Sequence, residues 1–338
     1  MINMNIIEEL LINKKKSCTP IWFMRQAGRH LPEFRKIREK NQNFIRLCLN
    51  EELSSEITLQ PIERYDLDAA IIFSDILIIP HALGQKIEFV KNKGPKLDNF
   101  EINLLNKEKK FFLKELKPIY KSISMTRKKL KKEKSLISFI GAPWTLTVYM
   151  LNLKTDEDKL NQNLFKKHEG KLEEISNRLV EFLCIHIKEQ IKAGANLIQV
   201  FDSWAGLLPN NYLKPLCLDA NKKISDFCKS NKIPIICFPK GIKEKYKEFT
   251  EFVNSDGISL DYEIDPLWAK KNINNVVMQG GMDPKILLES DDEIYREAKK
   301  YLDIFKDVPY IFNLGHGLIP ETNPEKLRKL VEFVRGYK

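Results

Sequence analysis

Four arginines lie close together near the amino terminus, in the stretch MRQAGRHLPEFRKIR (Met24–Arg38). They are Arg25, Arg29, Arg35 and Arg38. A guanidinium group stays charged and binds carboxylate or phosphate through two parallel hydrogen bonds. Gly28 and Pro32 argue against one regular helix, so we expect Arg25 and Arg29 to project from an irregular loop. The stretch is either an anion-binding loop or a set of surface arginines paired with acids such as Glu33.

One aspartate is placed to do chemistry. Asp75 ends the sequence DAAIIFSD (Asp68–Asp75), whose apolar run predicts a fully buried strand. A carboxylate at the end of such a strand needs a metal, an arginine or a ligand N–H as its partner. The alternative is a helix N-cap, which Ser74 or Asp75 could supply.

A histidine lies between two glycines after the last apolar run, in GHGLIPETNPE (Gly315–Glu325). Glycines on both sides of His316 let the backbone approach a ligand closely, and such a turn could also hold phosphate. A satisfied core histidine is the alternative. Pro324 predicts the start of a helix.

Two hydroxyl groups follow other apolar runs, Tyr149 in GAPWTLTVYM and Ser203 in FDSWAG. Ser203 is outside any GxSxG elbow, so we do not expect a hydrolase nucleophile. We expect Trp144 and Trp204 to belong to the core. Cys184 and His186 stand two apart in a helical pattern and form a poor chelate, and no nucleotide-binding glycine motif occurs. The sequence therefore predicts neither a metal nor an organic cofactor.

Eight short apolar runs alternate with amphipathic stretches along the chain, which predicts parallel strands covered by helices. The runs are Ile21–Met24, Ala69–Phe73, Leu136–Ile140, Asn196–Phe201, Ile233–Phe238, Gly257–Asp261, Val276–Gln279 and Tyr310–Leu314. Eight strands favour a single-domain (β/α)8 barrel over residues 1–338, with residues 1–19 as an amino-terminal extension. The first run could instead be an entry segment. The candidate residues above follow these strands, and barrels hold their active sites at that end.

Charge and composition exclude several classes of protein. The 338 residues carry a net charge of +10, of which +9 lies in residues 106–134. That segment has apolar residues at helical spacing, so we interpret it as a surface helix with a lysine-rich solvent face and expect no nucleic-acid partner. No apolar run is long enough to span a bilayer. Six scattered cysteines predict free thiols and a cytoplasmic location.

Seven motifs in order resemble the uroporphyrinogen decarboxylase family. They are MRQAGRHLPEFR, TLQPIERYDLDAAIIFSDIL, GAPWTL with Tyr149, QVFDSWAG, GISLDYEID, QGGMDP and NLGHGLIPETNPE. The resemblance covers about Pro20 to Val334. It implies a barrel, a homodimer, no cofactor, and conversion of the four acetate side chains of uroporphyrinogen III to methyl groups, giving coproporphyrinogen III and four CO2.

The resemblance also implies roles for particular residues. Asp75 takes the position where the four pyrrole N–H groups converge, and its anion would stabilise the cationic ring formed during reaction. Substrate-binding roles fall on Arg25, Gln26, Ala27, Gly28, Arg29, Arg35, Tyr149, Ser203 and His316. Arg25 is a second catalytic candidate, although its high pKa makes it a poor acid. A substrate carboxylic acid, a water molecule and His316 stay open as proton donors.

The chain departs from the family pattern at His30, His81 and the loop Met150–Lys159. These changes concern loop shape and substrate affinity. Three alternatives to the decarboxylase remain. They are a corrinoid-dependent barrel methyltransferase, which needs a zinc site that this sequence lacks, a non-catalytic tetrapyrrole-binding protein, and a basic nucleic-acid-binding protein.

Overall fold

Seven parallel strands form one curled sheet in the computed structural model, which describes residues 5–15, 18–90 and 94–337. The strand order is β1-β4-β5-β6-β7-β8-β9, so each strand pairs with the next strand of the same sheet along the chain. The bounds are β1 Ala69–Ile71, β4 Ser135–Gly141, β5 Leu197–Asp202, β6 Ile235–Pro239, β7 Gly257–Leu260, β8 Val277–Gly280 and β9 Tyr310–Ile311. A separate antiparallel hairpin, β2 (Ile87–Val90) and β3 (Gly94–Leu97), lies between α5 and α6 in the chain.

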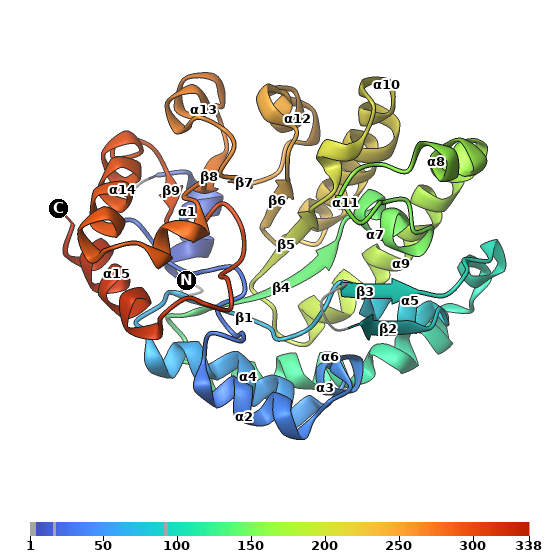
Figure 1. Cartoon of the computed structure of the whole chain (residues 1–338), viewed down its shortest axis with the longest axis horizontal. Helices are drawn as coiled ribbons and strands as arrows, with labels where there is room; N and C mark the ends of the chain where they lie inside the picture. Colours follow the sequence, from blue (N-terminus) through green and yellow to red (C-terminus); the bar gives the residue numbers. More distant parts are fainter. Residues whose placement is uncertain (1–4, 16–17, 91–93, 338) are drawn as a thin grey trace.

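Helices surround the sheet on its outer side, while α1 (Ile6–Asn13) packs on the inner side (Figure 1). The other helices are α2 Pro32–Lys40, α3 Phe44–Cys48, α4 Glu51–Arg64, α5 Ile78–Leu83, α6 Lys109–Lys129, α7 Pro143–Met150, α8 Gln162–His168, α9 Leu172–Lys192, α10 Asn210–Leu213, α11 Asp219–Ser230, α12 Tyr246–Val253, α13 Pro266–Asn272, α14 Asp291–Ile304 and α15 Pro324–Gly336. Strands and helices alternate, as the apolar runs predicted. Pro324 does begin a helix, with Asn323 as its N-cap.

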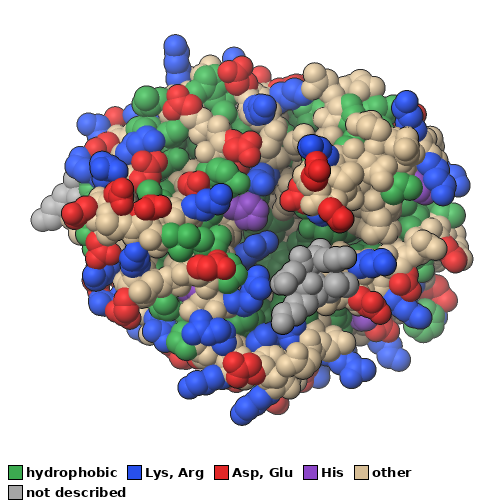
Figure 2. Space-filling view, in the orientation of Figure 1, with side chains coloured by type: hydrophobic (Ala, Val, Ile, Leu, Met, Phe, Trp, Pro, Cys, Tyr) green, Lys and Arg blue, Asp and Glu red, His purple; other side chains and the backbone are tan. Residues whose placement is uncertain are grey.

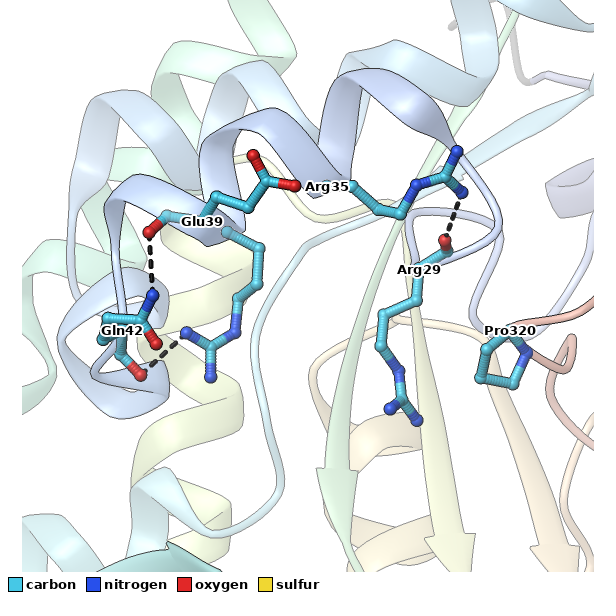
Figure 3. Close-up of a pocket in the computed structure, with 6 residues that line it drawn as sticks. Arg29, Arg35, Glu39, Gln42 and Pro320 are labelled. Carbon is cyan, nitrogen blue, oxygen red and sulfur yellow. Dashed lines mark hydrogen bonds between the residues drawn. The ribbon is translucent and has the colours of Figure 1, made fainter. Parts of the chain in front are cut away.

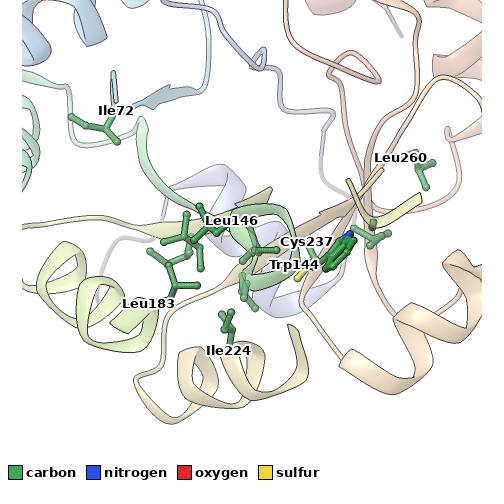
Figure 4. Close-up of a cluster of buried hydrophobic side chains, with 14 of the residues drawn as sticks. Ile72, Trp144, Leu146, Leu183, Ile224, Cys237 and Leu260 are labelled. Atoms are coloured by element: carbon green, nitrogen blue, oxygen red, sulfur yellow. The ribbon is translucent and has the colours of Figure 1, made fainter. Parts of the chain in front are cut away.

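The sheet has two apolar faces because successive strand residues point to opposite sides. The outer face packs against the helices through a large cluster that includes Leu146, Leu183 and Ile224 (Figure 4). The inner face forms a smaller cluster with side chains from every strand of the sheet except β7, among them Ile137 and Val277. Helix α1 contributes Ile7, Leu10 and Leu11 to that inner cluster and so covers the amino ends of the strands.

The prediction of a first strand at Ile21–Met24 is wrong, because these residues do not form a regular strand. Only Ile21 makes a parallel bridge, to Phe312 beyond β9, and Arg25 then turns the chain with a positive φ of 61°. On its other side the Ile21 carbonyl accepts a hydrogen bond from the Asp68 N–H at 2.9 Å, just before β1. This short segment therefore lies between the two edge strands of the sheet.

A chain of polar side chains crosses the inner face. The Trp22 indole Nε1–H donates to Gln279 Oε1 at 2.8 Å, and Gln279 Nε2 donates to Ser259 Oγ at 2.7 Å and to Gln199 Oε1 at 3.2 Å. All four residues are buried. Because each buried group has a partner, the network fixes the relative positions of the strands below the active-site end.

The basic segment forms α6, as predicted. Phe112, Leu116, Ile119 and Ile123 are fully buried on one face of this helix, and its lysines face solvent. In the part of the chain that the structure describes, no helix has both the length and the apolar character needed to cross a membrane.

Candidate active site

The predicted site residues follow the carboxyl ends of the strands, where the face of the molecule is hollowed (Figure 2). Asp75 follows β1, Tyr149 lies in α7 after β4, Ser203 follows β5, and His316 follows β9. Apolar side chains form the floor of the hollow, and Lys and Arg side chains gather around its rim.

Aromatic rings from neighbouring strands pack edge to face at this end of the inner face. The ring centroids of Phe139 and Phe201 are 5.5 Å apart, those of Phe201 and Phe238 are 6.3 Å apart, and those of Phe238 and His316 are 6.2 Å apart. Phe201, at the centre of this row, therefore joins the rings of β4 and β6 in one aromatic layer. Such a layer offers a flat, apolar ligand one face to pack against.

Asp75 forms a tight turn before α5. Its Oδ1 accepts a hydrogen bond from the Leu77 N–H at 2.8 Å, so the local turn occupies one carboxylate oxygen. The side chain does not cap α5, whose N-cap is Leu77. Burial raises the pKa of Asp75 to about 6, and the Leu77 hydrogen bond and the charge of Arg25 oppose that rise. The carboxylate is thus ionised at neutral pH but less stable as an anion than in water.

Arg25 packs against the loop that carries His316. A Cβ atom added to Gly317 would lie 2.3 Å from Arg25 Cδ, so the close approach of this side chain requires glycine there. The Gly317 N–H donates to His316 Nδ1 at 2.6 Å. A phosphate-binding turn would need this backbone N–H as a donor to the phosphate, and here it already has an acceptor. The glycines around His316 therefore serve close packing between loops.

The three residues after Arg25 differ in exposure. Gln26 is fully buried, and its Oε1 accepts from the Phe23 N–H at 3.1 Å while its Nε2 donates to the Ala69 carbonyl at 3.0 Å. Its side chain thus ties the arginine loop to the start of β1. Ala27 and Gly28 are half-buried and follow at the mouth. Contact of these three residues with substrate stays a prediction.

Arg29 and Arg35 line an open depression of about 510 Å³, together with Arg38, Glu39, Gln42 and Pro320 (Figure 3). Arg35 Nη1 donates to the backbone carbonyls of Arg29 at 2.9 Å and His30 at 3.1 Å. Arg35 therefore stabilises the conformation of the loop through the loop's backbone. The Arg29 guanidinium points away from Arg35 (Figure 3). The acid Glu33 pairs with Arg64 instead, at 2.9 Å, so the sequence-based alternative of pairing within the arginine stretch is wrong for Glu33.

His316 is half-buried, and its pKa is lowered to about 3 by burial, with the charges of Arg25 and Lys240 acting in the same direction. Because Nδ1 accepts the Gly317 N–H, the neutral ring carries its proton on Nε2 and can donate one hydrogen bond. Tyr149 packs edge to face on Trp204 at 6.1 Å, and burial raises the pKa of its hydroxyl. Trp144 is core as predicted, whereas Trp204 is only half-buried.

Sequence reasoning placed Asp202, the residue before Ser203, at the end of a strand but gave it no role. This buried carboxylate accepts from Thr145 Oγ1 at 2.7 Å, and Thr145 Oγ1 accepts from the Trp204 N–H at 3.1 Å. Asp202 thereby joins α7, which carries Tyr149, to the loop that carries Ser203. Its position directly after an apolar run was the signal that could have found it.

Sequence reasoning also missed Lys240, which directly follows β6. The sequence FPKG places a cation and a glycine at the end of a predicted strand, the same signal that singled out Asp75. In the ranges 5–15, 18–90 and 94–337, no three His, Cys, Asp or Glu side chains gather as metal ligands.

The fold and the charged mouth define a class, the barrel-like α/β enzymes with a site at the carboxyl ends of parallel strands. A methyltransferase from Methanosarcina mazei shares this fold with a TM-score of 0.77 and 17% identity over 97% of each chain. Residues 5–337 match the family Uroporphyrinogen decarboxylase (URO-D). The chain is 41% identical to the uroporphyrinogen decarboxylase of Rickettsia bellii (strain RML369-C), covering 94% of this chain and 95% of that protein. It is 40% identical to that of Wolbachia pipientis wMel, covering 96% of both. The chain belongs to the uroporphyrinogen decarboxylase family.

Proposed function

We propose that this chain decarboxylates the four acetate side chains of uroporphyrinogen III in haem biosynthesis, giving coproporphyrinogen III and four CO2. Family membership over nearly the whole chain supports the reaction. The observation that carries it is the pairing of Asp75, one half-buried anion, with a mouth at which Lys and Arg side chains gather. The rim suits a substrate with eight carboxylates, and the anion suits its pyrrole N–H groups.

Each decarboxylation needs an electron sink, which the substrate itself supplies. Protonation of a pyrrole carbon makes a cationic ring, and the C–C bond to the acetate carboxylate then breaks with its electron pair flowing into that ring. CO2 leaves, and a second proton at the exocyclic carbon completes the methyl group. One proton is returned to solvent as the ring regains its neutral form, so each cycle consumes one proton.

Asp75 acts by stabilising the cationic ring. Its carboxylate is already in place and ionised at neutral pH, and it interacts more strongly with the cation than with the neutral substrate. The oxygen that does not accept from Leu77 is the one assigned to the pyrrole N–H groups.

His316 binds a substrate carboxylate as a neutral Nε2–H donor. A pKa of about 3 makes its protonated form rare at neutral pH, so the ring is poorly suited to deliver the first proton. Arg25 is charged throughout and is a poor acid for the same purpose. A substrate carboxylic acid or a water molecule is the better donor. Tyr149, Ser203, Arg29 and the backbone of Gln26–Gly28 complete the binding surface.

The proposed architecture is a single-domain (β/α)8 barrel closed by residues 20–24. Trp22 and Met24 belong to the inner cluster and Ile21 and Phe23 to the outer one, the alternation that an eighth strand would show. By family resemblance the protein works as a cytoplasmic homodimer without metal or organic cofactor. Light scattering tests the dimer, and turnover after exhaustive dialysis against a chelator tests the independence from metal.

The deciding experiment is anaerobic incubation with reduced uroporphyrinogen III, followed by oxidation and chromatographic counting of carboxyl groups. A ladder of seven-, six-, five- and four-carboxyl products supports the decarboxylase. Bound but unchanged substrate would refute it in favour of a tetrapyrrole-binding protein.

A further inference from the structure

Backbone hydrogen bonds fix the position of Lys240 at the mouth. Its backbone N–H donates to the Asp202 carbonyl at 3.1 Å, and its own carbonyl accepts from the Gly206 N–H at 2.9 Å. The next residue, Gly241, donates its N–H to Asp261 Oδ2 at 2.7 Å. Hydrogen bonds to the loops after β5 and β7 therefore fix the backbone from which this side chain projects.

The side chain of Lys240 is half-buried and has no acidic partner. Its Nζ lies 5.8 Å from the centroid of the Tyr262 ring, a cation–π contact that limits where the ammonium can go. Across the described ranges, no carboxylate lies within ion-pair distance of it, although eighteen other Lys or Arg contacts of that kind are formed. A partly desolvated cation without an anion is unfavourable unless a ligand supplies one.

Arg25 and Arg29, which are exposed, also form no ion pair within the described residues, and they lie on another wall of the mouth. Residues 20–22 lie between the two edge strands of the sheet, β9 and β1. Strand β6 is the middle strand of the seven and so lies on the opposite side of the sheet from these residues. His316 links the two walls, because its loop packs on Arg25 through Gly317 and its ring packs on Phe238 of β6. Lys240 follows Phe238 by two residues and thus faces the arginine loop across the aromatic layer.

We propose that Lys240 binds a peripheral carboxylate of the substrate on the side of the macrocycle away from Arg25 and Arg29. This inference rests on the proposed function, and it gives the substrate a second anchoring point on the protein. A macrocycle with carboxylates around its whole edge presents anions to both walls when it lies over the aromatic floor. The carboxylate belongs either to an acetate, which the reaction removes, or to a propionate, which it keeps.

The test uses the full-length protein and the variants Lys240→Met and Lys240→Arg. Methionine keeps the unbranched chain over Tyr262 and removes the charge, while arginine restores the charge. Loss of one charged hydrogen bond predicts a fall in kcat/KM of about ten- to hundredfold for Lys240→Met, mainly through KM. Lys240→Arg should recover most of it. Lys128→Met, which removes the same charge from the exposed side of α6, should behave as the wild type.

Comparison of substrates identifies the side chain that is bound. An equal loss with uroporphyrinogen and with the five-carboxyl intermediate assigns Lys240 to a propionate, and a loss confined to the early steps assigns it to an acetate. An unchanged KM in Lys240→Met, or a Lys240→Arg variant as impaired as the methionine variant, would overturn the inference. Both results require a wild-type protein that produces the ladder of products, and absence of that ladder refutes the proposed function instead.

Discussion

Asp75→Asn separates the charge of this residue from its shape. In the structure one carboxylate oxygen accepts the Leu77 N–H at 2.8 Å, and the amide oxygen of asparagine can accept the same bond. The turn before α5 should therefore survive. What disappears is the negative charge that faces the reacting ring.

The expected loss is in kcat. Removal of one preorganised electrostatic group from an active site lowers kcat by about 10²- to 10³-fold. KM should rise as well, because an asparagine whose amide oxygen accepts the Leu77 N–H turns an NH2 donor toward the pyrrole N–H groups.

The same change should stabilise the folded protein. Burial raises the pKa of Asp75 from 3.8 to about 6, so the folded state holds its proton more tightly than the unfolded chain. Stability consequently falls as pH rises from about 4 to about 6, and the full penalty applies above pH 6. The shift corresponds to about 3 kcal/mol as an upper value, and partial exposure reduces it to roughly 1–2 kcal/mol. Asparagine carries no such penalty.

Two assays test this reasoning. Anaerobic turnover gives kcat and KM, and thermal unfolding at pH 7.5 and pH 4.5 gives the stability difference. We expect a Tm a few degrees above wild type at pH 7.5, with the difference shrinking at pH 4.5. In the wild type, kcat/KM should fall on the acid side with a midpoint near pH 6. Near-normal turnover by Asp75→Asn would refute the catalytic role, and a lowered Tm at pH 7.5 would refute the electrostatic penalty.

Three further changes test other parts of the site. Arg29→Ala should raise KM about ten- to hundredfold with a smaller change in kcat, because it removes a guanidinium that pairs with no acid in the described chain; steady-state kinetics measures both. Gly317→Ala should lower activity strongly while the fold persists, because the new Cβ would lie 2.3 Å from Arg25 Cδ and displace that side chain. Trp22→Phe should lower stability by about 1–3 kcal/mol, since Gln279 Oε1 loses its buried donor, and thermal unfolding reports it.

For each of these variants there is either a control variant or a result that would contradict the prediction. Gly170→Ala introduces the same methyl group where nothing lies within 4 Å, and it should leave activity unchanged. Unaltered KM and kcat in Arg29→Ala would remove that residue from the binding surface. A Tm equal to wild type in Trp22→Phe would show that the polar chain across the inner face contributes little to stability.

The sequence predicted the alternation of strands and helices because each strand of the seven-stranded sheet is buried on both faces and reads as one apolar run. It also predicted which residues would stand at the mouth, since Asp75, Ser203 and His316 each follow such a run. The prediction was wrong at Ile21–Met24, where the composition is that of a strand. Only one bridge forms there, because the chain turns at Arg25 to place that side chain over Gly317.

The missing part of the site could not be read from residue types alone. Asp202 and Lys240 each follow an apolar run, but no local pattern shows what they contact, because Asp202 accepts from Thr145 and Lys240 accepts from Gly206 across long stretches of chain. Likewise the sequence left Arg35 with the other arginines as a substrate ligand. The structure shows its guanidinium bonded to two backbone carbonyls, so its own contact with substrate stays a prediction.

The charged groups at the mouth lack ion-pair partners within the described residues, and one kind of ligand could supply partners for them. Asp75 is an anion whose burial raises its pKa, and Arg25, Arg29 and Lys240 are cations without ion pairs in the described residues. Burial makes the Asp75 anion less favourable, and the half-buried Lys240 is likewise less favourable without a partner, whereas Arg25 and Arg29 are exposed. A ligand with N–H groups at its centre and carboxylates at its edge supplies all of the missing partners at once. Binding of such a ligand therefore removes several unfavourable terms together, and a smaller anion that reaches only one wall cannot do so.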